Sequence, residues 1–158
     1  MSGPVELGEL DYPMFIVTAA ARDERAGCLV GFATQCSIDP LRFIVCLSDK
    51  NRTFRVAQEA SLLAVHVVPE GADDLARLFG SETGDETDKF ERCSWTPGPE
   101  GTPVLDDCGN WFAGRILDRV DVGDHWAFLL APLRGADQAG EDAFSFQDAR
   151  WIEPGHEA

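Results

Sequence analysis

Residues 26–40 read AGCLVGFATQCSIDP, and they contain the clearest indication of the fold. Its apolar part, residues 28–34, is too short for a stable helix and follows another apolar run at residues 14–20. The link between the two runs, residues 22–27, is polar and ends in glycine, which predicts a β-hairpin. Gly31 lies inside the second strand, where a glycine indicates a bulge or a place where another group approaches the backbone closely.

Outward from this hairpin, the chain alternates short apolar runs with polar turns. Residues 48–51 offer capping side chains before a helix predicted over residues 53–60, whereas prolines and glycines predict an irregular connection over residues 94–101. A Gly-Asp turn at residues 123–124 joins the last two apolar runs into a second hairpin. The other predicted elements are strands at residues 42–47, 62–68, 111–122 and 125–133 and a short helix at residues 72–79.

The apolar runs follow one another too closely for crossover helices, so a parallel α/β sheet fits badly. We expect a mostly β protein, a small antiparallel β-barrel with short peripheral helices. The length of 158 residues suits a single domain over residues 1–158. Its core is expected over about residues 12–134, with loosely held ends at residues 1–10 and 154–158.

The chain carries a formal net charge of −15, from 13 Lys and Arg against 28 Asp and Glu. Nucleic acids and anionic membrane surfaces are therefore poor partners. A local basic patch at Lys50, Arg52 and Arg55 can still receive the phosphate of a small molecule, because salt screens charges beyond about 8–10 Å. The alternative is that these side chains form an ordinary solvated helix face.

The five cysteines show no Cys-x-x-Cys or Cys-x-x-His spacing, so we expect no structural metal site. Cys28 and Cys46 lie in apolar runs, where a free thiol packs as a small hydrophobe in a reducing compartment. The N-terminus has no apolar leader, and no run approaches the roughly 18 apolar residues of a membrane helix. We therefore expect a cytoplasmic protein.

Six motifs follow one another along the chain: residues 26–40, VCLSDKNRT at 45–53, HVV at 66–68, TGDETDKF at 83–90, GTPVL at 101–105 and GDH at 123–125. Their order resembles the flavin reductase-like, FMN-binding split-barrel family. Each motif alone is weak, but together they cover most of residues 12–133. The resemblance implies an antiparallel split β-barrel that binds FMN or FAD and forms a homodimer, with the second hairpin and residues 144–151 near the partner subunit.

In this family, the first long strand and the loop after it lay backbone groups along the polar edge of the isoalloxazine ring. By resemblance these residues are Ala33, Thr34, Gln35 and Cys36, and Gly31 leaves room for the ring. Without the resemblance, Gly31 is a packing bulge, and Thr34 and Gln35 merely leave the strand. One proline of the commoner family pattern is missing after the Asp-Pro pair, which keeps FMN, FAD and a deazaflavin open.

Lys50, Asn51, Arg52 and Thr53 resemble the phosphate clamp of the family, placed where a strand leads into a helix. A helix N-terminus presents unpaired N–H groups and a partial positive charge to an anion. Asn51 and Thr53 can add neutral hydrogen bonds, and Lys50 or Arg52 a charge-assisted one. Asn51 or Thr53 can also simply cap the helix, and the two roles are compatible.

Two histidines have different expected roles. By resemblance, His125 lies near the open face of the flavin, where the nicotinamide stacks. The alternative is that His125 is a hairpin residue with no role in the reaction. His66 stands between valines in a predicted strand, which favours a core or barrel-end histidine with satisfied hydrogen bonds.

The resemblance implies an NAD(P)H-dependent flavin reductase that passes hydride from NADH or NADPH to FMN or FAD, alone or as the reductase component of a two-component monooxygenase. Such a reaction needs no catalytic acid or base, because the chemistry belongs to the two nucleotides. Two alternatives remain open. One is a non-enzymatic flavin-binding electron carrier, and the other is a split barrel that binds a deazaflavin or haem.

Overall fold

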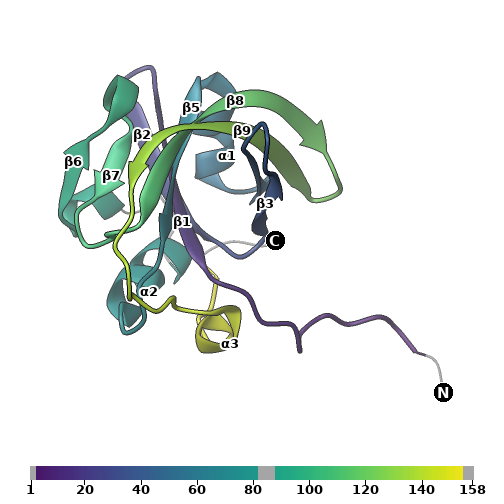
Figure 1. Cartoon of the computed structure of the whole chain (residues 1–158). Helices are drawn as coiled ribbons and strands as arrows, with labels where there is room; N and C mark the ends of the chain where they lie inside the picture. The colour runs from purple at the N-terminus through teal and green to yellow at the C-terminus, as the bar shows by residue number, and fades with distance from the viewer. Residues whose placement is uncertain (1–2, 82–87, 155–158) are drawn as a thin grey trace.

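The computed structural model describes residues 3–81 and 88–154 (Figure 1). Seven of its strands form one antiparallel sheet in the order β2-β1-β5-β8-β9-β4-β3. The sheet curls without closing, and this confirms the predicted split barrel. Its strands are β1 (Phe15–Ala21), β2 (Glu24–Val30), β3 (Ala33–Ser37), β4 (Arg42–Ser48), β5 (Leu62–Val67), β8 (Trp111–Asp121) and β9 (His125–Ala136).

The two hairpins predicted from the sequence are present. In the first, β1 and β2 pair from Phe15 opposite Val30 to Ala21 opposite Glu24. In the second, β8 and β9 meet at the turn that contains Gly123, whose φ of 148° favours glycine.

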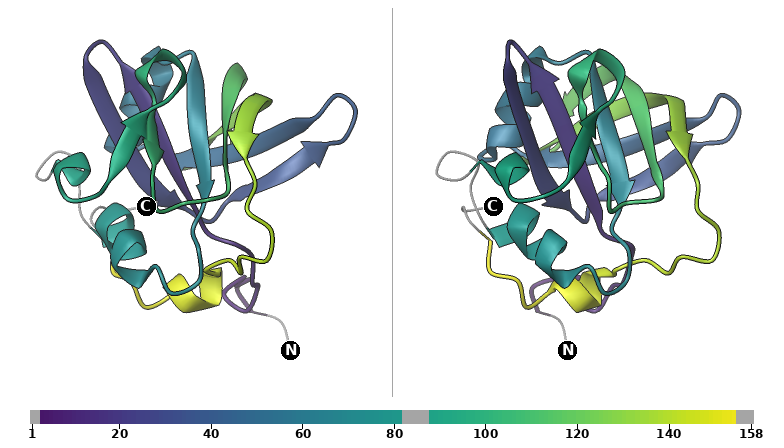
Figure 2. Two further views of the ribbon diagram at one scale, coloured as in Figure 1. Left: turned by 60° about the vertical axis from the view of Figure 1, so that its left-hand side comes forward. Right: turned by 90° about the vertical axis from the view of Figure 1, so that its left-hand side faces the viewer.

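The predicted strand over residues 28–34 is wrong as a single element, because the structure divides it at Gly31 and Phe32. Residues before this point pair with β1, and residues after it pair with β4, so the chain passes from one edge of the sheet to the other. Gly31 is a position where another group approaches the backbone closely, which is the second of the two readings given for it from the sequence. A Cβ at this position would lie 2.8 Å from Cε2 of Tyr12. The β3–β4 hairpin that follows projects from the body of the barrel (Figure 2).

The predicted irregular connection over residues 94–101 is also wrong in part. Residues of β6 (Trp95–Pro97) pair with β7 (Pro103–Leu105) in a separate two-stranded sheet. A strand of three residues is too short to show a period of two, and prolines are tolerated in such edge strands.

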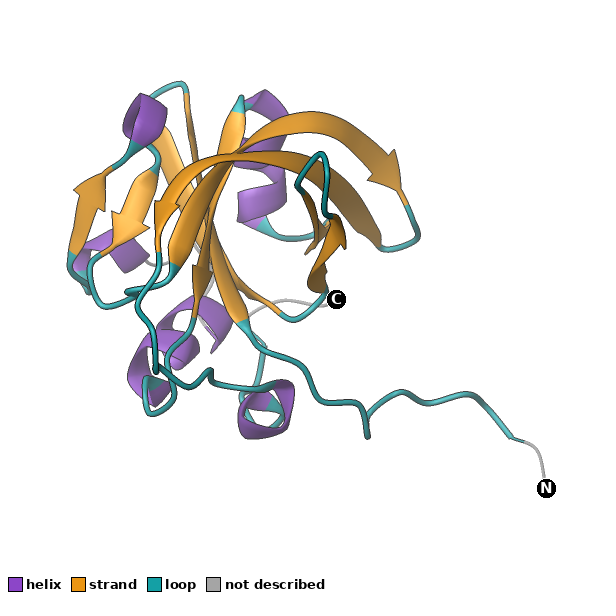
Figure 3. Cartoon of the chain, viewed as in Figure 1, coloured by secondary structure: helices purple, strands orange, loops and turns teal. Residues whose placement is uncertain are grey.

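The helices lie outside the strands (Figure 3). Helix α1 (Arg52–Glu59) begins one residue before the predicted start, and α2 (Asp73–Ser81) begins one residue after the start of the second predicted helix and ends two residues beyond its predicted end. A short α3 (Phe146–Ala149) and two 3₁₀ turns, η1 (Lys89–Glu91) and η2 (Pro99–Gly101), complete the set within the described residues. No helix within residues 3–81 and 88–154 is long and apolar enough to span a bilayer.

His66 is a core histidine, as its position between valines predicted. It is fully buried, and its Nδ1 lies 2.8 Å from the carbonyl oxygen of Ile16. Its Nε2 accepts a hydrogen bond from the backbone N–H of Leu105 (3.0 Å), so the hydrogen of the neutral ring is on Nδ1 and is donated to Ile16. Burial lowers the pKa of His66 to about 4, and His66 thus joins β1, β5 and β7 as an uncharged group.

Candidate functional site

A pocket of about 170 Å³ lies in the split of the barrel, between β2 and β4. The pairing of β4 with its edge neighbour β3 ends at Val45. One further hydrogen bond joins the N–H of Cys46 to the carbonyl oxygen of Phe32 (2.8 Å). Beyond that bond, Cys28–Val30 and Cys46–Ser48 form the two walls. The pocket therefore exists because the sheet does not close here.

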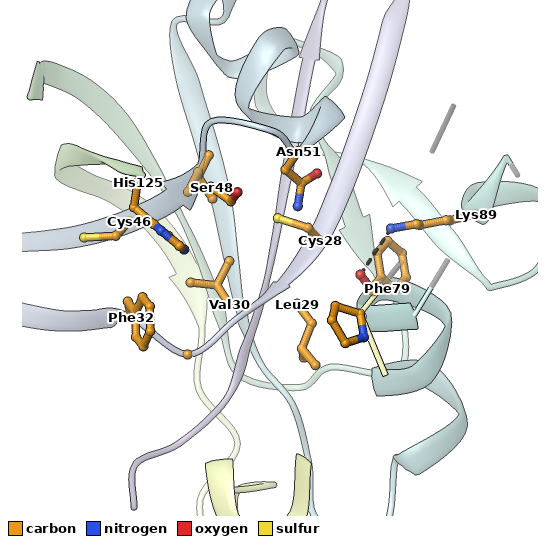
Figure 4. Close-up of a pocket in the computed structure, with 14 residues that line it drawn as sticks. Cys28, Leu29, Val30, Phe32, Cys46, Ser48, Asn51, Phe79, Lys89 and His125 are labelled. Atoms are coloured by element: carbon orange, nitrogen blue, oxygen red, sulfur yellow. Dashed lines mark hydrogen bonds between the residues drawn. The ribbon is translucent and has the colours of Figure 1, made fainter. Parts of the chain in front are cut away.

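The two ends of this pocket differ in chemistry (Figure 4). One end carries Phe32, Cys46 and His125, and the other carries Phe79 and Lys89. Ser48 and Asn51 lie between the ends, on the side of β4 that leads into α1. An aromatic and weakly polar end is thus separated from a cationic one by neutral hydrogen-bonding groups.

His125 is held in place at the first end by two neighbours. Its Nδ1 lies 2.7 Å from Oδ1 of Asp124, and the centroid of its ring lies 5.2 Å from that of Phe32. The hydrogen bond with His125 lowers the pKa of Asp124. The backbone N–H of Asp49 donates to the carbonyl oxygen of Asp124 (3.0 Å), which ties the β8–β9 turn to the start of the α1 loop.

Lys89 forms the second end, and its side chain is almost completely buried. Its Nζ donates to the carbonyl oxygens of Gly27 and Phe79, each at 3.1 Å. Lys89 thus brings an amino group to this end of the pocket, where a lysine side chain favours an anion. Sequence reasoning did not select Lys89 as a site residue, although residues 83–90 were among the six motifs; residues 83–87 lie outside the described residues.

Asn51 places the N-terminus of α1 against the pocket. Its Oδ1 accepts from the backbone N–H of Thr53 (3.0 Å), which is the capping role considered from the sequence. The side chain of Thr53 is fully buried, and its hydroxyl has no hydrogen-bond partner among the described residues. Burial raises the pKa of Cys28 and of Cys46, so both pocket thiols are neutral at physiological pH.

The structure brings together only part of the predicted set. Gly31, Asn51 and His125 line the pocket. Lys50 is exposed but near enough for its charge to lower the pKa of Asp124, which puts it at the His125 end. Arg52 points elsewhere, with its guanidinium 3.2 Å from Oε2 of Glu24.

Ala33, Thr34 and Cys36 lie on β3. They follow the lining residues Gly31 and Phe32 in the chain but do not line the pocket themselves. Gln35 lines a second, larger and mainly apolar pocket of about 480 Å³, together with side chains such as Phe43 and Phe112. Among the residues that the structure describes, no cluster of three or more His, Cys, Asp or Glu is placed to bind a metal ion.

Comparison with known proteins gives one family match. The family model described as "Flavin reductase like domain" matches residues 7–153. An FMN reductase (NADH) RutF 2 from Rhizobium rhizogenes is 30% identical over 129 residues, which are 79% of this chain and 74% of that protein. A probable flavin reductase from Rhizobium meliloti is 25% identical over 142 residues, or 87% of this chain, but this chain spans only 44% of the relative's length.

A solved structure gives the same fold. The NADH:FAD oxidoreductase SgcE6 of Streptomyces globisporus superimposes with a TM-score of 0.81 at 20% sequence identity. The match covers 94% of this chain and 85% of that one. At this identity the likeness shows the fold alone.

Proposed function

This chain belongs to the family of flavin reductase-like domains, and from that premise we propose that it is an NAD(P)H-dependent flavin reductase. The observation that carries the proposal is the two-ended pocket in the split of the barrel. A flavin nucleotide has an aromatic ring at one end and a phosphate at the other. The pocket offers His125 and Phe32 at one end and the ammonium group of Lys89 at the other, which matches this order.

Several residues are suited to hold the flavin. Lys89 and the N-terminus of α1 at Asn51 would bind the phosphate, since both present positive charge or N–H groups to the pocket. The ring would extend past Phe32 toward the exposed backbone of Ala33–Ser37, whose polar groups can meet its pyrimidine edge. Lys50 would add charge near Asp124, and Thr53 would form the buried wall behind Cys28.

The chemistry supplied by the bound nucleotides is the transfer of hydride from the nicotinamide to the flavin. What the protein contributes is binding, orientation and exclusion of water. His125 would contact the nicotinamide side, held by Asp124. Cys28 and Cys46 remain neutral thiols and so offer no competing nucleophile at the ring.

A second subunit would complete the site. Ligand pockets that enclose a small molecule usually measure about 300–1,000 Å³, and the pocket here measures about 170 Å³. Large apolar side chains at the His125 end are exposed: Phe32 is 55% exposed, and Val122, whose backbone N–H donates to the carbonyl oxygen of His125, is 58% exposed. A homodimer that covers these residues would enclose the flavin between two subunits.

Partner and location follow from the same proposal. The reduced flavin would pass to an acceptor such as a separate monooxygenase, as the family resemblance implies. All five cysteines are free in the structure, and the reaction draws on NADH or NADPH, so the proposed location is the cytoplasm.

An anaerobic titration tests the proposal. Purified protein receives FMN, then NADH or NADPH, while the flavin absorbance is followed. Bleaching of many equivalents of FMN per subunit is the expected result. Flavin binding without nicotinamide-dependent bleaching would favour the electron carrier, and absence of flavin binding would leave the deazaflavin and haem alternatives.

A further inference from the structure

We propose that residues 3–10 form an arm that docks in the second pocket of another copy of this chain. The arm is the segment that precedes β1 and leaves the barrel in Figure 1. The second pocket is the apolar one of about 480 Å³, which shares no lining residue with the pocket in the split. The inference therefore specifies an interface of the proposed homodimer, and flavin reduction does not depend on it.

The arm exposes large apolar side chains. Every residue from 3 to 10 is exposed, with Val5 at 88% and Leu7 at 66%. Neither hydrophobic cluster of the core includes Val5, Leu7 or Leu10. Burial of such side chains against a second surface stabilises an association.

The base of the arm is attached to α3. Nε2 of Gln147 donates to the carbonyl oxygens of Gly8 (2.9 Å) and Leu10 (2.8 Å), and the backbone N–H of Gln147 donates to Oδ1 of Asp11 (3.0 Å). Residues 3–7 lie beyond this attachment and can span about 17 Å when extended. A fixed base lowers the entropy cost of docking the rest of the arm.

The second pocket follows an edge of β9 that has no strand beside it. The pairing of β9 with β4 ends at Leu130, which lies opposite Phe43. From Ala131 to Ala136, β8 is the only strand paired with β9 in the part of the chain that the structure describes. Such an edge offers backbone groups to an extended segment, although Pro132 has no N–H to donate.

The walls of the second pocket suit the apolar side chains of the arm. Its main apolar lining residues are Leu41, Phe43, Val65, Trp111, Phe112 and Leu133. Of these, Leu41 and Leu133 are exposed, so an occupant of the pocket would cover them. Val5 and Leu7 are two positions apart, and an extended segment therefore presents both to the same surface.

Charge favours the arm as the occupant. Arg134 lines the pocket, and within residues 3–81 and 88–154 its guanidinium has no ion-pair or hydrogen-bond partner, Asp137 of the same lining included. The arm carries Glu6 and Glu9, both exposed. Two copies that each carry a net charge of −15 repel each other, so a cation that meets an acidic arm offsets part of this repulsion.

A photo-crosslinking amino acid in place of Leu7 tests the contact directly. In a mixture of ¹⁵N-labelled and unlabelled chains, mass spectrometry distinguishes a cross-link between two copies from one within a single copy. The expected product joins position 7 of one copy to residues 131–137 of another. The same amino acid in place of Trp151, which is exposed and outside the pocket, is the control and should not give this product.

Charge reversal gives a second test. Arg134→Glu, or Glu6→Arg together with Glu9→Arg, should raise the dissociation constant of the dimer roughly tenfold. Arg115→Glu is the matched control, because Arg115 is exposed on the neighbouring β8 and does not line the pocket; its effect should stay below about twofold.

A mixture of the two charge-reversed chains separates docking from general repulsion. In a heterodimer each arm meets a pocket of opposite charge, so native mass spectrometry of an equimolar mixture should show more heterodimer than random pairing gives. General repulsion alone would place the stability of the heterodimer between those of the two homodimers.

The possible failures are distinguishable. A monomeric protein, random pairing of the two chains, or cross-links confined to one copy or to another surface would overturn the arm and leave flavin reduction as proposed. A cross-link from position 7 to residues 131–137 in a protein that binds no flavin would support the arm and overturn the proposed function.

Discussion

Oδ1 of Asp124 lies 2.7 Å from Nδ1 of His125, at the end of the pocket where Phe32 packs on the same imidazole ring. An ionised carboxylate only accepts hydrogen bonds, so the neutral ring keeps its hydrogen on Nδ1 and leaves Nε2 as an acceptor. Asp124→Asn allows the other tautomer, because an amide can donate to Nδ1. We expect kcat/KM for NADH to fall roughly three- to tenfold, with flavin affinity nearly unchanged.

Two measurements check this prediction together. Steady-state kinetics gives kcat/KM, and the ¹⁵N chemical shifts of the His125 ring give the tautomer. Asp124→Ala removes the acceptor altogether and should resemble Asp124→Asn in kinetics. A changed tautomer with unchanged kcat/KM would separate His125 from the nicotinamide side of the reaction.

Lys89→Met removes the cation at the other end of the pocket. We expect the Kd of FMN to rise roughly 10- to 100-fold, the usual effect of losing a charge-assisted hydrogen bond. Riboflavin, which has the same ring and no phosphate, should bind as it does to the unaltered protein. Isothermal titration with both ligands therefore separates phosphate binding from the structural role of Lys89 at the carbonyl of Phe79.

Arg52→Gln is the matched control for Lys89. The Arg52 guanidinium donates to the carbonyl oxygen of Arg25 (2.8 Å) and lies beside Glu24, so its loss should change the Kd of FMN by less than about twofold. An effect on FMN larger than that of Lys89→Met would move the phosphate to Arg52, which the family resemblance places in a phosphate clamp with Lys50, Asn51 and Thr53.

The parts of the site that the sequence predicts are those that depend on local chemistry. Asn51 caps a helix because its side chain precedes a helical stretch, and His66 is buried because apolar neighbours surround it in a strand. The turn before His125 is likewise read from a glycine at one position. In each case the residues that determine the structure are close together in the chain.

The parts that the sequence does not predict depend on contacts between distant residues. Lys89 reaches Gly27, which is 62 positions away, and no periodic pattern encodes such a pair. The division of residues 28–34 follows from the crossing between the two edges of the sheet, which only the whole barrel defines. Cys46 lines the split only because Val45 is the last β4 residue paired with β3.

Thr53→Val tests whether the buried hydroxyl of Thr53 takes part in binding. The hydroxyl has no hydrogen-bond partner among the described residues, so its replacement by a methyl group of similar size removes an unsatisfied polar atom. We expect the free energy of unfolding to stay the same or to rise by up to about 1 kcal/mol, with the Kd of FMN unchanged. Chemical denaturation and a flavin titration measure the two quantities, and weaker FMN binding at undiminished stability would instead place Thr53 in contact with the phosphate.

His66 makes the free energy of unfolding depend on pH, and this residue lies outside the flavin site. Its pKa is about 4 in the folded chain, because burial disfavours the charged ring, whereas an unfolded chain has the ordinary histidine value of about 6.5. Well above pH 6.5 the ring is neutral in both states, and the contribution of His66 to stability is fully present. As the pH falls from about 6.5 to about 4, the unfolded state takes up a proton that the folded state does not, so stability decreases by about 1.4 kcal/mol per pH unit at most.

His66→Gln keeps an acceptor for Leu105 and a donor for Ile16 but does not titrate in this range. Urea denaturation of both proteins between pH 4 and pH 7 should therefore show a stability difference that shifts by about 2–3 kcal/mol in favour of the Gln variant as the pH falls. Parallel curves would mean that His66 is not the group whose protonation opposes folding, and that the carboxylates account for the whole acid sensitivity.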